Sequence, residues 1–174
     1  MRRLLFIVLV VALGPAVAGQ RCDTNDFPLS LPTERFEANG DGTVTDRASG
    51  LMWMRCAIGQ TWQGERCSGS AERFDWAGAG AAADAVNGSG DWFFNDWRVP
   101  GLRDLAMVIE RQCVNPRTNL TLFPDTPPDF FWTSTLRPGD EDGDAYALSF
   151  GPEGVQHRPK SEQYYLRLVR TAAP

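Results

Sequence analysis

Residues 130–134 read Phe-Phe-Trp-Thr-Ser, a run of aromatic and β-branched side chains that favours a buried β-strand. The segment that follows alternates in polarity, with Tyr146, Leu148 and Phe150 on one face, and residues 164–170 alternate in the same way. The last third of the chain therefore predicts strands at 130–134, 144–150, 154–158 and 164–170.

Two helices are expected before these strands. Small and apolar residues recur at helical spacing over 76–86, with Asp75 as a cap and Asn87-Gly88 as the stop. A second helix is expected from about Leu102 to Gln112, after the Pro100-Gly101 entry. Two helices followed by a strand-rich half predict the α+β fold class.

Shorter strands are expected nearer the N-terminus. Residues 35–38 and 43–46 flank Asn39-Gly-Asp-Gly42, which is a strong hairpin turn signal. The spacing of Asn39 and Asp41 fits this turn better than it fits a calcium-binding EF-hand loop. Residues 51–54 predict one more short, buried strand.

Length and charge limit the possible classes of protein. The 174 residues suit one domain plus a short extra segment. The 17 basic and 22 acidic residues give a net charge of −5, which argues against a nucleic-acid partner. One His and 4 widely spaced Cys offer little for a zinc site.

The first 18 residues have the pattern of an export signal. Arg2 and Arg3 precede an apolar run over 4–13, and Ala16-Val-Ala18 predicts cleavage before Gly19. The run is too short for a permanent anchor, so we expect no membrane span after cleavage and a secreted or periplasmic protein. An uncleaved anchor is the main alternative. Residues 19–33 are then expected to form an irregular N-terminal arm.

The cysteines predict two disulfides, because an exported chain meets an oxidising environment. Three pairings are possible. The short separation and turn-rich sequence between them favour Cys56–Cys67, which leaves Cys22–Cys113. No Cys-x-x-Cys is present, so thiol–disulfide exchange is not indicated.

A set of short phrases in one order resembles the Lcl C-terminal domain family, named for the terminal domain of a bacterial collagen-like adhesin. The phrases are Asn39-Gly-Asp-Gly-Thr-Val-Thr-Asp, Gly50-Leu-Met-Trp, Arg55-Cys with Gly59-Gln and Trp62, Asp96-Trp-Arg-Val-Pro, Phe123-Pro, Phe131-Trp-Thr-Ser and Val169-Arg. The resemblance covers residues 34–172. It implies a C-type-lectin-like fold in which two helices pack on antiparallel sheets and the N- and C-terminal strands pair. The namesake's collagen-like stalk has no counterpart here, because the chain has no Gly-x-y tract.

The phrase Asp96-Trp-Arg-Val-Pro100 also resembles formylglycine-generating sulfatase-modifying domains. Those enzymes use a late cysteine pair, whereas this chain has no cysteine after Cys113. We therefore interpret the phrase as structural, with Trp97 in the core and Arg98 as a buried or partly buried ion-pair partner. Trp53 and Trp132 are expected to be structural as well.

Trp92-Phe93-Phe94 follows the flexible-looking stretch 87–91 and supplies the candidate ligand contacts. Three consecutive aromatic side chains cannot all point into one core from a helix or strand. Exposed aromatics stack on sugar faces or anchor protein partners, so Trp92 or Phe93 is expected to contact a ligand. The alternative is an apolar plug beneath the loop.

The acidic stretch 140–144 is the candidate cation site. Asp140, Asp142 and Asp144 occupy alternate positions, but Gly151 stands where an EF-hand needs Glu. A looser calcium site and a solvated acidic loop both fit, and no other cofactor is indicated. Calcium-dependent sugar binding of the usual lectin kind is not supported, because Phe94-Asn-Asp96 lacks the companion Pro-containing motif.

No catalytic residue is expected. His157 is the only histidine and has no matched nucleophile nearby in the sequence. The expected function is a non-enzymatic, adhesin-like binding module for a surface glycan or protein. A diverged formylglycine-generating-like or carboxylate-based enzyme, and an envelope assembly subunit, are the alternatives. The ligand and the oligomeric state stay open.

Overall fold

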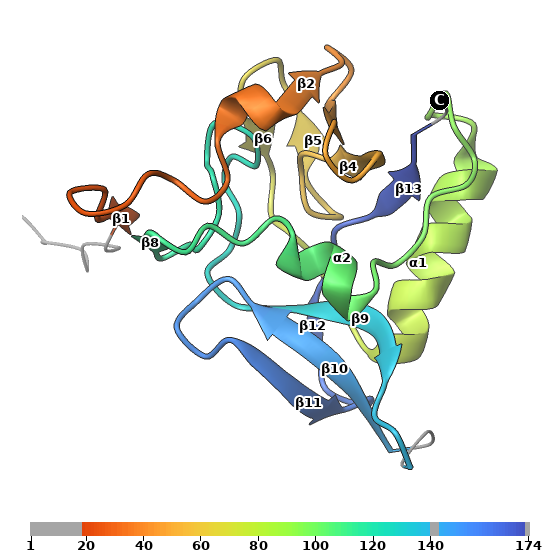
Figure 1. Ribbon diagram of the computed structural model, residues 1–174. Coiled ribbons are helices and arrows are strands. Elements are labelled where there is room, and N and C mark those ends of the chain that lie inside the picture. Colours follow the sequence, from red (N-terminus) through yellow and green to blue (C-terminus); the bar gives the residue numbers. More distant parts are fainter. Residues whose placement is uncertain (1–18, 140–142, 173–174) are drawn as a thin grey trace, which may run out of the picture.

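The computed structural model describes residues 19–139 and 143–172 of the chain (Figure 1). The expected signal segment 1–18 lies outside these residues, as do two calcium candidates, Asp140 and Asp142. Within the described ranges, no helix has the length and apolar character needed to cross a membrane.

Two main sheets carry the fold. One contains β2 (Phe36–Ala38), β3 (Thr43–Asp46), β4 (Leu51–Met54) and β13 (Val169–Thr171), in the order β13-β4-β3-β2. The other contains β7 (Arg73–Phe74), β9 (Phe130–Leu136), β10 (Asp144–Ser149), β11 (Val155–Pro159) and β12 (Tyr164–Tyr165), in the order β11-β10-β9-β12-β7. Two small ribbons pair β1 (Arg21–Cys22) with β8 (Cys113–Val114) and β5 (Thr61–Trp62) with β6 (Cys67–Ser68). Together with its helices, this architecture is α+β.

The predicted hairpin over residues 35–46 is present as the pair β2–β3. Its turn is stabilised by Asp41, whose Oδ1 accepts hydrogen bonds from the N–H and the hydroxyl of Thr43 at 2.9 and 2.6 Å. This is the Asx-type bonding that makes such residues good turn formers.

The prediction of a single strand over 164–170 is wrong. The chain forms β12 in one sheet and β13 in the other, and Leu166 and Leu168 cross the core between them. Their carbonyl oxygens accept hydrogen bonds from the N–H groups of Ile58 and Met54. The side-chain alternation continues through the crossing, so it could not reveal the change of sheet. The pair β12–β9 is parallel, which makes the five-stranded sheet mixed rather than antiparallel.

The helix α1 (Trp76–Ser89) is longer than predicted. Asp75 caps it as expected, by accepting a hydrogen bond from the N–H of Gly78. The helix continues through Asn87 and Gly88 and ends at Gly90, which adopts a left-handed conformation with φ 75°. Asn87 therefore lies within the helix, and its side chain bonds to the backbone of Trp97, as described below.

The helix α2 (Leu102–Ala106) is much shorter than the predicted span to Gln112. After it, the N–H groups of Val108 and Ile109 bond three residues back, at 3.3 and 3.4 Å. The buried Glu110 carboxylate then accepts hydrogen bonds from Ser30, Leu31 and Gln112. Burial raises the pKa of this carboxyl, but these hydrogen bonds outweigh it and hold the pKa below its ordinary value. Hydrogen bonds between the Glu110 side chain and the distant residues Ser30 and Leu31 therefore take the place of helical hydrogen bonds.

The expected pairing of the N- and C-terminal strands is also wrong in detail. The last strand, β13, pairs with β4, while the first strand, β1, pairs with β8. The predicted disulfide Cys22–Cys113 is present and joins these two short strands, so it anchors the mostly irregular segment 19–33 to the body. A 3₁₀ turn, Thr33–Arg35, leads from this segment into β2.

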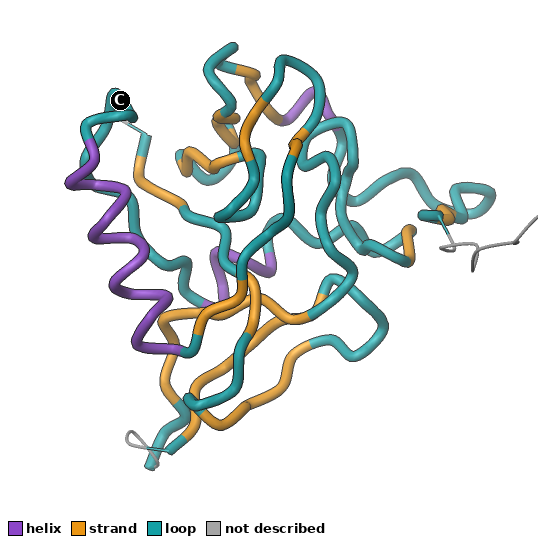
Figure 2. Tube along the Cα trace, turned by 180° about the vertical axis from the view of Figure 1, so that it is seen from behind, coloured by secondary structure: helices purple, strands orange, loops and turns teal. Residues whose placement is uncertain are grey.

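The core has two aromatic-rich clusters. Trp53 is buried in one, and Trp97 and Trp132 are buried in the other. In the second cluster, Ala79 and Ala83 of α1 meet side chains from both sheets, and α1 runs along one side of the molecule (Figure 2). Arg98 forms the expected ion pair with an acidic side chain, Asp104, at 2.8 Å, and its side chain is 43% exposed, so it is not fully buried.

Candidate ligand-binding groove

The segment between Cys56 and Cys67, here called the disulfide loop, carries Trp62. The Cα of Gly42 lies directly against this tryptophan: a Cβ there would come within 2.8 Å of the Trp62 Cβ. Gly42 also has φ +91°, which favours glycine. The Arg55 guanidinium lies 4.0 Å from the centre of the Trp62 ring. Trp62 is therefore held by glycine and arginine neighbours before any ligand arrives.

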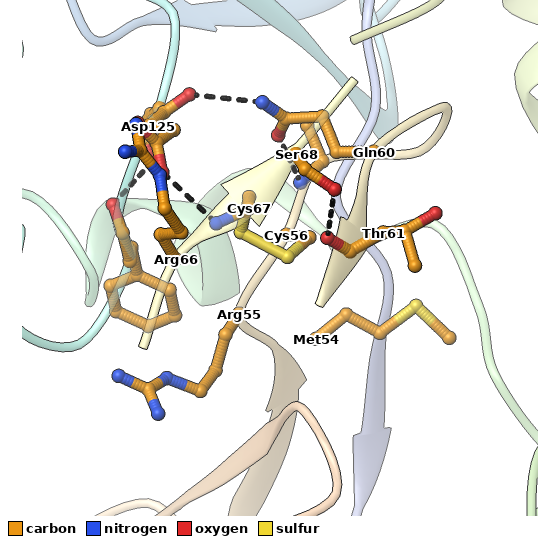
Figure 3. Close-up of a disulfide and its surroundings, with 12 residues drawn as sticks. Met54, Arg55, Cys56, Gln60, Thr61, Arg66, Cys67, Ser68 and Asp125 are labelled. Carbon is orange, nitrogen blue, oxygen red and sulfur yellow. Dashed lines mark hydrogen bonds and ion pairs between the residues drawn. A yellow bond between two sulfur atoms is a disulfide. The ribbon is translucent and has the colours of Figure 1, made fainter. Parts of the chain in front are cut away.

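A hydrogen-bond network closes the base of the disulfide loop beside the Cys56–Cys67 bond (Figure 3). The Asp125 carboxylate accepts from the Cys67 N–H at 2.9 Å and from Arg66 at 3.2 Å. The Gln60 side chain accepts from the Ala57 N–H at 3.1 Å and donates to the Asp125 carbonyl at 3.2 Å. Covalent and polar contacts therefore fix the same short segment.

Arg167 supports this loop from within the core. It is fully buried and donates to the carbonyl oxygens of Met54 and Arg55 and to the Thr126 hydroxyl. Burial lowers the pKa of its guanidinium to about 9, which leaves the group charged at neutral pH. The strand that leads into Cys56 is thus bonded at its end to a buried cation.

Residues 90–97, here called the aromatic loop, return the chain from the end of α1 to the core. The Asn87 amide donates to the Trp97 carbonyl and accepts from the Trp97 N–H, both at 2.8 Å. The Trp92 ring packs edge-on against Trp97, with 5.7 Å between ring centres. Asn87 and Trp97 therefore fix one end of the loop.

The last strand fixes the middle of the aromatic loop. The Arg170 guanidinium lies 3.7 Å from the centre of the Phe94 ring and donates to Asp96 at 2.6 and 3.2 Å. The hydrogen bond from Arg170 lowers the pKa of the Asp96 carboxyl. The ring of its neighbour Phe93 meets the Phe94 ring edge-on, with 5.1 Å between ring centres, and Phe93 is 92% exposed.

A groove of about 690 Å³ separates the disulfide loop from the aromatic loop. Trp62, Trp92 and Phe93 line it, together with apolar side chains from β4, the disulfide loop and α1, which are Met54, Ile58 and Val86. Asp41 and Asp91 also line it, and no Lys, Arg or His is among its described lining residues. Size and lining suit a small ligand or a short segment of a partner.

The structure brings both predicted contacts, Trp92 and Phe93, to one groove: Phe93 is exposed and Trp92 is half-buried. Sequence reasoning missed Trp62, Asp41 and Asp91 as members of this site. A tryptophan inside a short disulfide-closed segment was the available signal for Trp62. The sequence carried no signal for Asp41 and Asp91, because these residues reach the aromatic side chains only through the tertiary fold.

The third calcium candidate, Asp144, is not part of the groove. Its carboxylate pairs with Arg137 at 3.3 Å and with the His157 Nδ1 at 3.2 Å. Asp144 begins β10, at the opposite end of the molecule from the end of α1 that leads into the aromatic loop (Figure 1). Across residues 19–139 and 143–172, no three His, Cys, Asp or Glu side chains are grouped to hold a metal.

Comparison with known proteins gives one family match. A sequence model described as the Lcl C-terminal domain matches residues 42–170. The matched span contains the disulfide loop, the aromatic loop and all groove residues named above except Asp41. No curated protein matches the chain.

Proposed function

The chain belongs to the Lcl C-terminal domain family, and from this membership and the groove we propose that it is an exported, non-enzymatic, adhesin-like binding module. The groove between the disulfide and aromatic loops is its recognition site, and the ligand is a component of a cell surface or extracellular matrix, either glycan or protein. The C-type-lectin-like architecture and calcium-independent binding are part of the same proposal.

One observation carries this proposal: Phe93 is almost fully exposed beside Trp62 and Trp92, in a loop whose neighbouring residues are firmly bonded. Exposing an aromatic ring to water is unfavourable, and nothing in the packing of the described residues requires it here. An exposed aromatic at the edge of a groove is typical of a binding contact.

The two disulfides support export, because such bonds persist in oxidising compartments. The groove lining supports binding rather than catalysis. Its only cysteine, Cys56, is bonded in a disulfide, and no histidine is among its described lining residues. The chemistry available there is stacking, apolar contact and hydrogen bonding.

The test compares Phe93→Ala with Val155→Ala, which removes another exposed apolar side chain outside the groove. Both variants should keep the melting temperature of the native protein, since neither side chain is buried. Binding is measured on glycan arrays and on immobilised matrix proteins, with and without calcium. We expect Phe93→Ala to lose the binding and Val155→Ala to keep it. Equal binding by both variants would refute the proposal.

A further inference from the structure

The charge of the groove limits what it can bind. Its charged lining residues are Asp41 and Asp91, and no described cation lines it to neutralise them. The whole chain is also acidic, with a net charge of −5. A polyanion would meet repulsion both at long range and in the groove, whereas a cation would meet attraction in both.

Both carboxylates are available to a ligand. Asp41 uses Oδ1 for the hairpin turn, and its Oδ2 has no partner among the described residues. The Asp91 carboxylate accepts no hydrogen bond and forms no ion pair within residues 19–139 and 143–172, while its N–H donates to the Ser89 hydroxyl. Both residues are exposed, so neither needs an internal partner for the fold.

The aromatic lining adds a second attraction for a cation. Tryptophan is the side chain that binds ammonium and guanidinium groups best through its ring face. This protein already uses such contacts internally, with arginine over Trp62 at 4.0 Å and over Phe94 at 3.7 Å. Arg55 already occupies one face of the Trp62 ring, so Trp92 and Phe93, beside the two carboxylates, form the cation-attracting part of the lining.

The apolar lining specifies the rest of the ligand. Met54, Ile58 and Val86 offer no hydrogen-bonding group except the weak thioether, and the Gln60 amide is already bonded to Ala57 and Asp125. A sugar ring seated against these three apolar side chains would leave the hydroxyl groups that face them unpaired, which is costly. An alkyl chain that ends in a cation matches the apolar lining and the carboxylates together.

We propose that the groove binds a lysine or arginine side chain presented by a partner protein. This inference rests on the proposed function and specifies its ligand. The alkyl stem packs on Met54 and Ile58, the cationic end lies among the aromatic rings, and Asp41 and Asp91 provide the opposite charge. The partner is therefore a protein with an exposed basic segment.

The probes are four blocked pentapeptides that differ only at a central residue among glycines: lysine, arginine, glutamine and N-acetyl-lysine. Titration with the full chain is followed by tryptophan fluorescence and calorimetry at low and at physiological ionic strength. We expect the two cationic peptides to bind about tenfold more tightly than the two neutral ones, and salt to reduce this difference.

Charge-neutralising variants locate the effect. Asp91→Asn and Asp41→Asn should each weaken binding of the lysine peptide about threefold. The asparagine side chain in Asp41→Asn keeps an oxygen that can accept the hydrogen bonds of the turn. Asp84→Asn is the matched control, because it removes one exposed carboxylate from α1 outside the groove. We expect it to bind as the native protein does.

Two results would overturn the inference: equal binding of cationic and neutral peptides, or unchanged affinity in both groove variants. If neutral glycans bind instead and Phe93→Ala abolishes that binding, the proposed function stands and this inference fails. If the lysine peptide, the glycans and the matrix proteins all bind Phe93→Ala as they bind the native protein, the proposed function fails as well.

Discussion

The two sides of the groove are fixed by different kinds of bond. The disulfide loop is closed by Cys56–Cys67 and by the Asp125 and Gln60 network at its base. The aromatic loop has no covalent closure and depends on Asn87, on Arg170 and on ring packing. The disulfide loop is held by a covalent cross-link, whereas the aromatic loop can open when a few polar contacts break.

This difference suggests a division of roles. The disulfide loop holds Trp62 in place and so lowers the conformational entropy lost on binding. The aromatic loop is held by hydrogen bonds and one partly exposed ion pair, and it can shift to fit a partner because such contacts have low local stability. Phe93, the most exposed aromatic of the site, lies in this aromatic loop.

Removal of the Cys56–Cys67 bond should have the largest effect on the groove. A Cys56→Ser, Cys67→Ser protein loses a cross-link between residues separated by 11 positions. The chain-entropy model gives a loss of about 3 kcal/mol in unfolding free energy for such a loop. Since Trp62 lies within it, we also expect binding to the groove to be lost. Denaturant titration and the lysine-peptide titration measure the two effects.

The other disulfide is the control for this experiment. Cys22→Ser with Cys113→Ser also destabilises the protein, because Cys22–Cys113 closes a longer segment. It joins β1 to β8, and neither cysteine lines the groove. The folded fraction should therefore bind normally. Equal loss of binding in the two double variants would show that overall stability, rather than the disulfide loop, governs the groove.

Asn87→Ala should have the next largest effect. It removes both hydrogen bonds to the Trp97 backbone and leaves a buried residue's N–H and carbonyl without these partners. The expected loss is about 1–3 kcal/mol in unfolding free energy. Amide hydrogen exchange at Trp97 should accelerate more than exchange in the disulfide loop. Asp84→Ala on the exposed face of α1 is the control, with an expected change within about 0.5 kcal/mol.

The sequence predicted the parts of the site that depend on local rules. Cysteine spacing favoured the Cys56–Cys67 bond, which the structure contains. Three successive aromatics implied an exposed ring, and Phe93 is exposed. The anchor at Asn87 was misread as a helix stop, because its bonds to Trp97 depend on where the loop returns.

The groove itself could not be predicted, because it forms between segments that meet only in the folded chain. Trp62 and Asp41 come together because Gly42 leaves space for the tryptophan, a relation between a hairpin turn and a distant loop. The same reason explains the shortened α2: Glu110 bonds to Ser30 and Leu31, about eighty residues earlier in the sequence. Periodicity carries no information on contacts of this range.

Arg170→Met tests the remaining anchor of the aromatic loop and should have a smaller effect. The side chain of Arg170 is 7% exposed, so methionine fits its apolar surroundings, but the contacts with Phe94 and Asp96 are lost. Asp96 is 53% exposed, and solvent therefore weakens the ion pair. We expect a loss of about 1 kcal/mol in unfolding free energy and a more mobile Phe93. An unchanged protein would show that ring packing alone holds the loop.

Acid should loosen the aromatic loop by a still smaller amount, and the direction follows from Asp96. The hydrogen bond from Arg170 lowers the pKa of this carboxyl, so the folded state binds its proton less readily than the unfolded state does. The stabilisation is therefore complete above the ordinary carboxyl pKa and is lost as the pH falls through the lowered value. In Arg170→Met the shift should disappear, and Asp96 should titrate at a higher pH than in the native protein. Titration of the Asp96 carboxyl by nuclear magnetic resonance measures this directly, and equal midpoints in the two proteins would mean that the Arg170 contact does not hold the loop in solution.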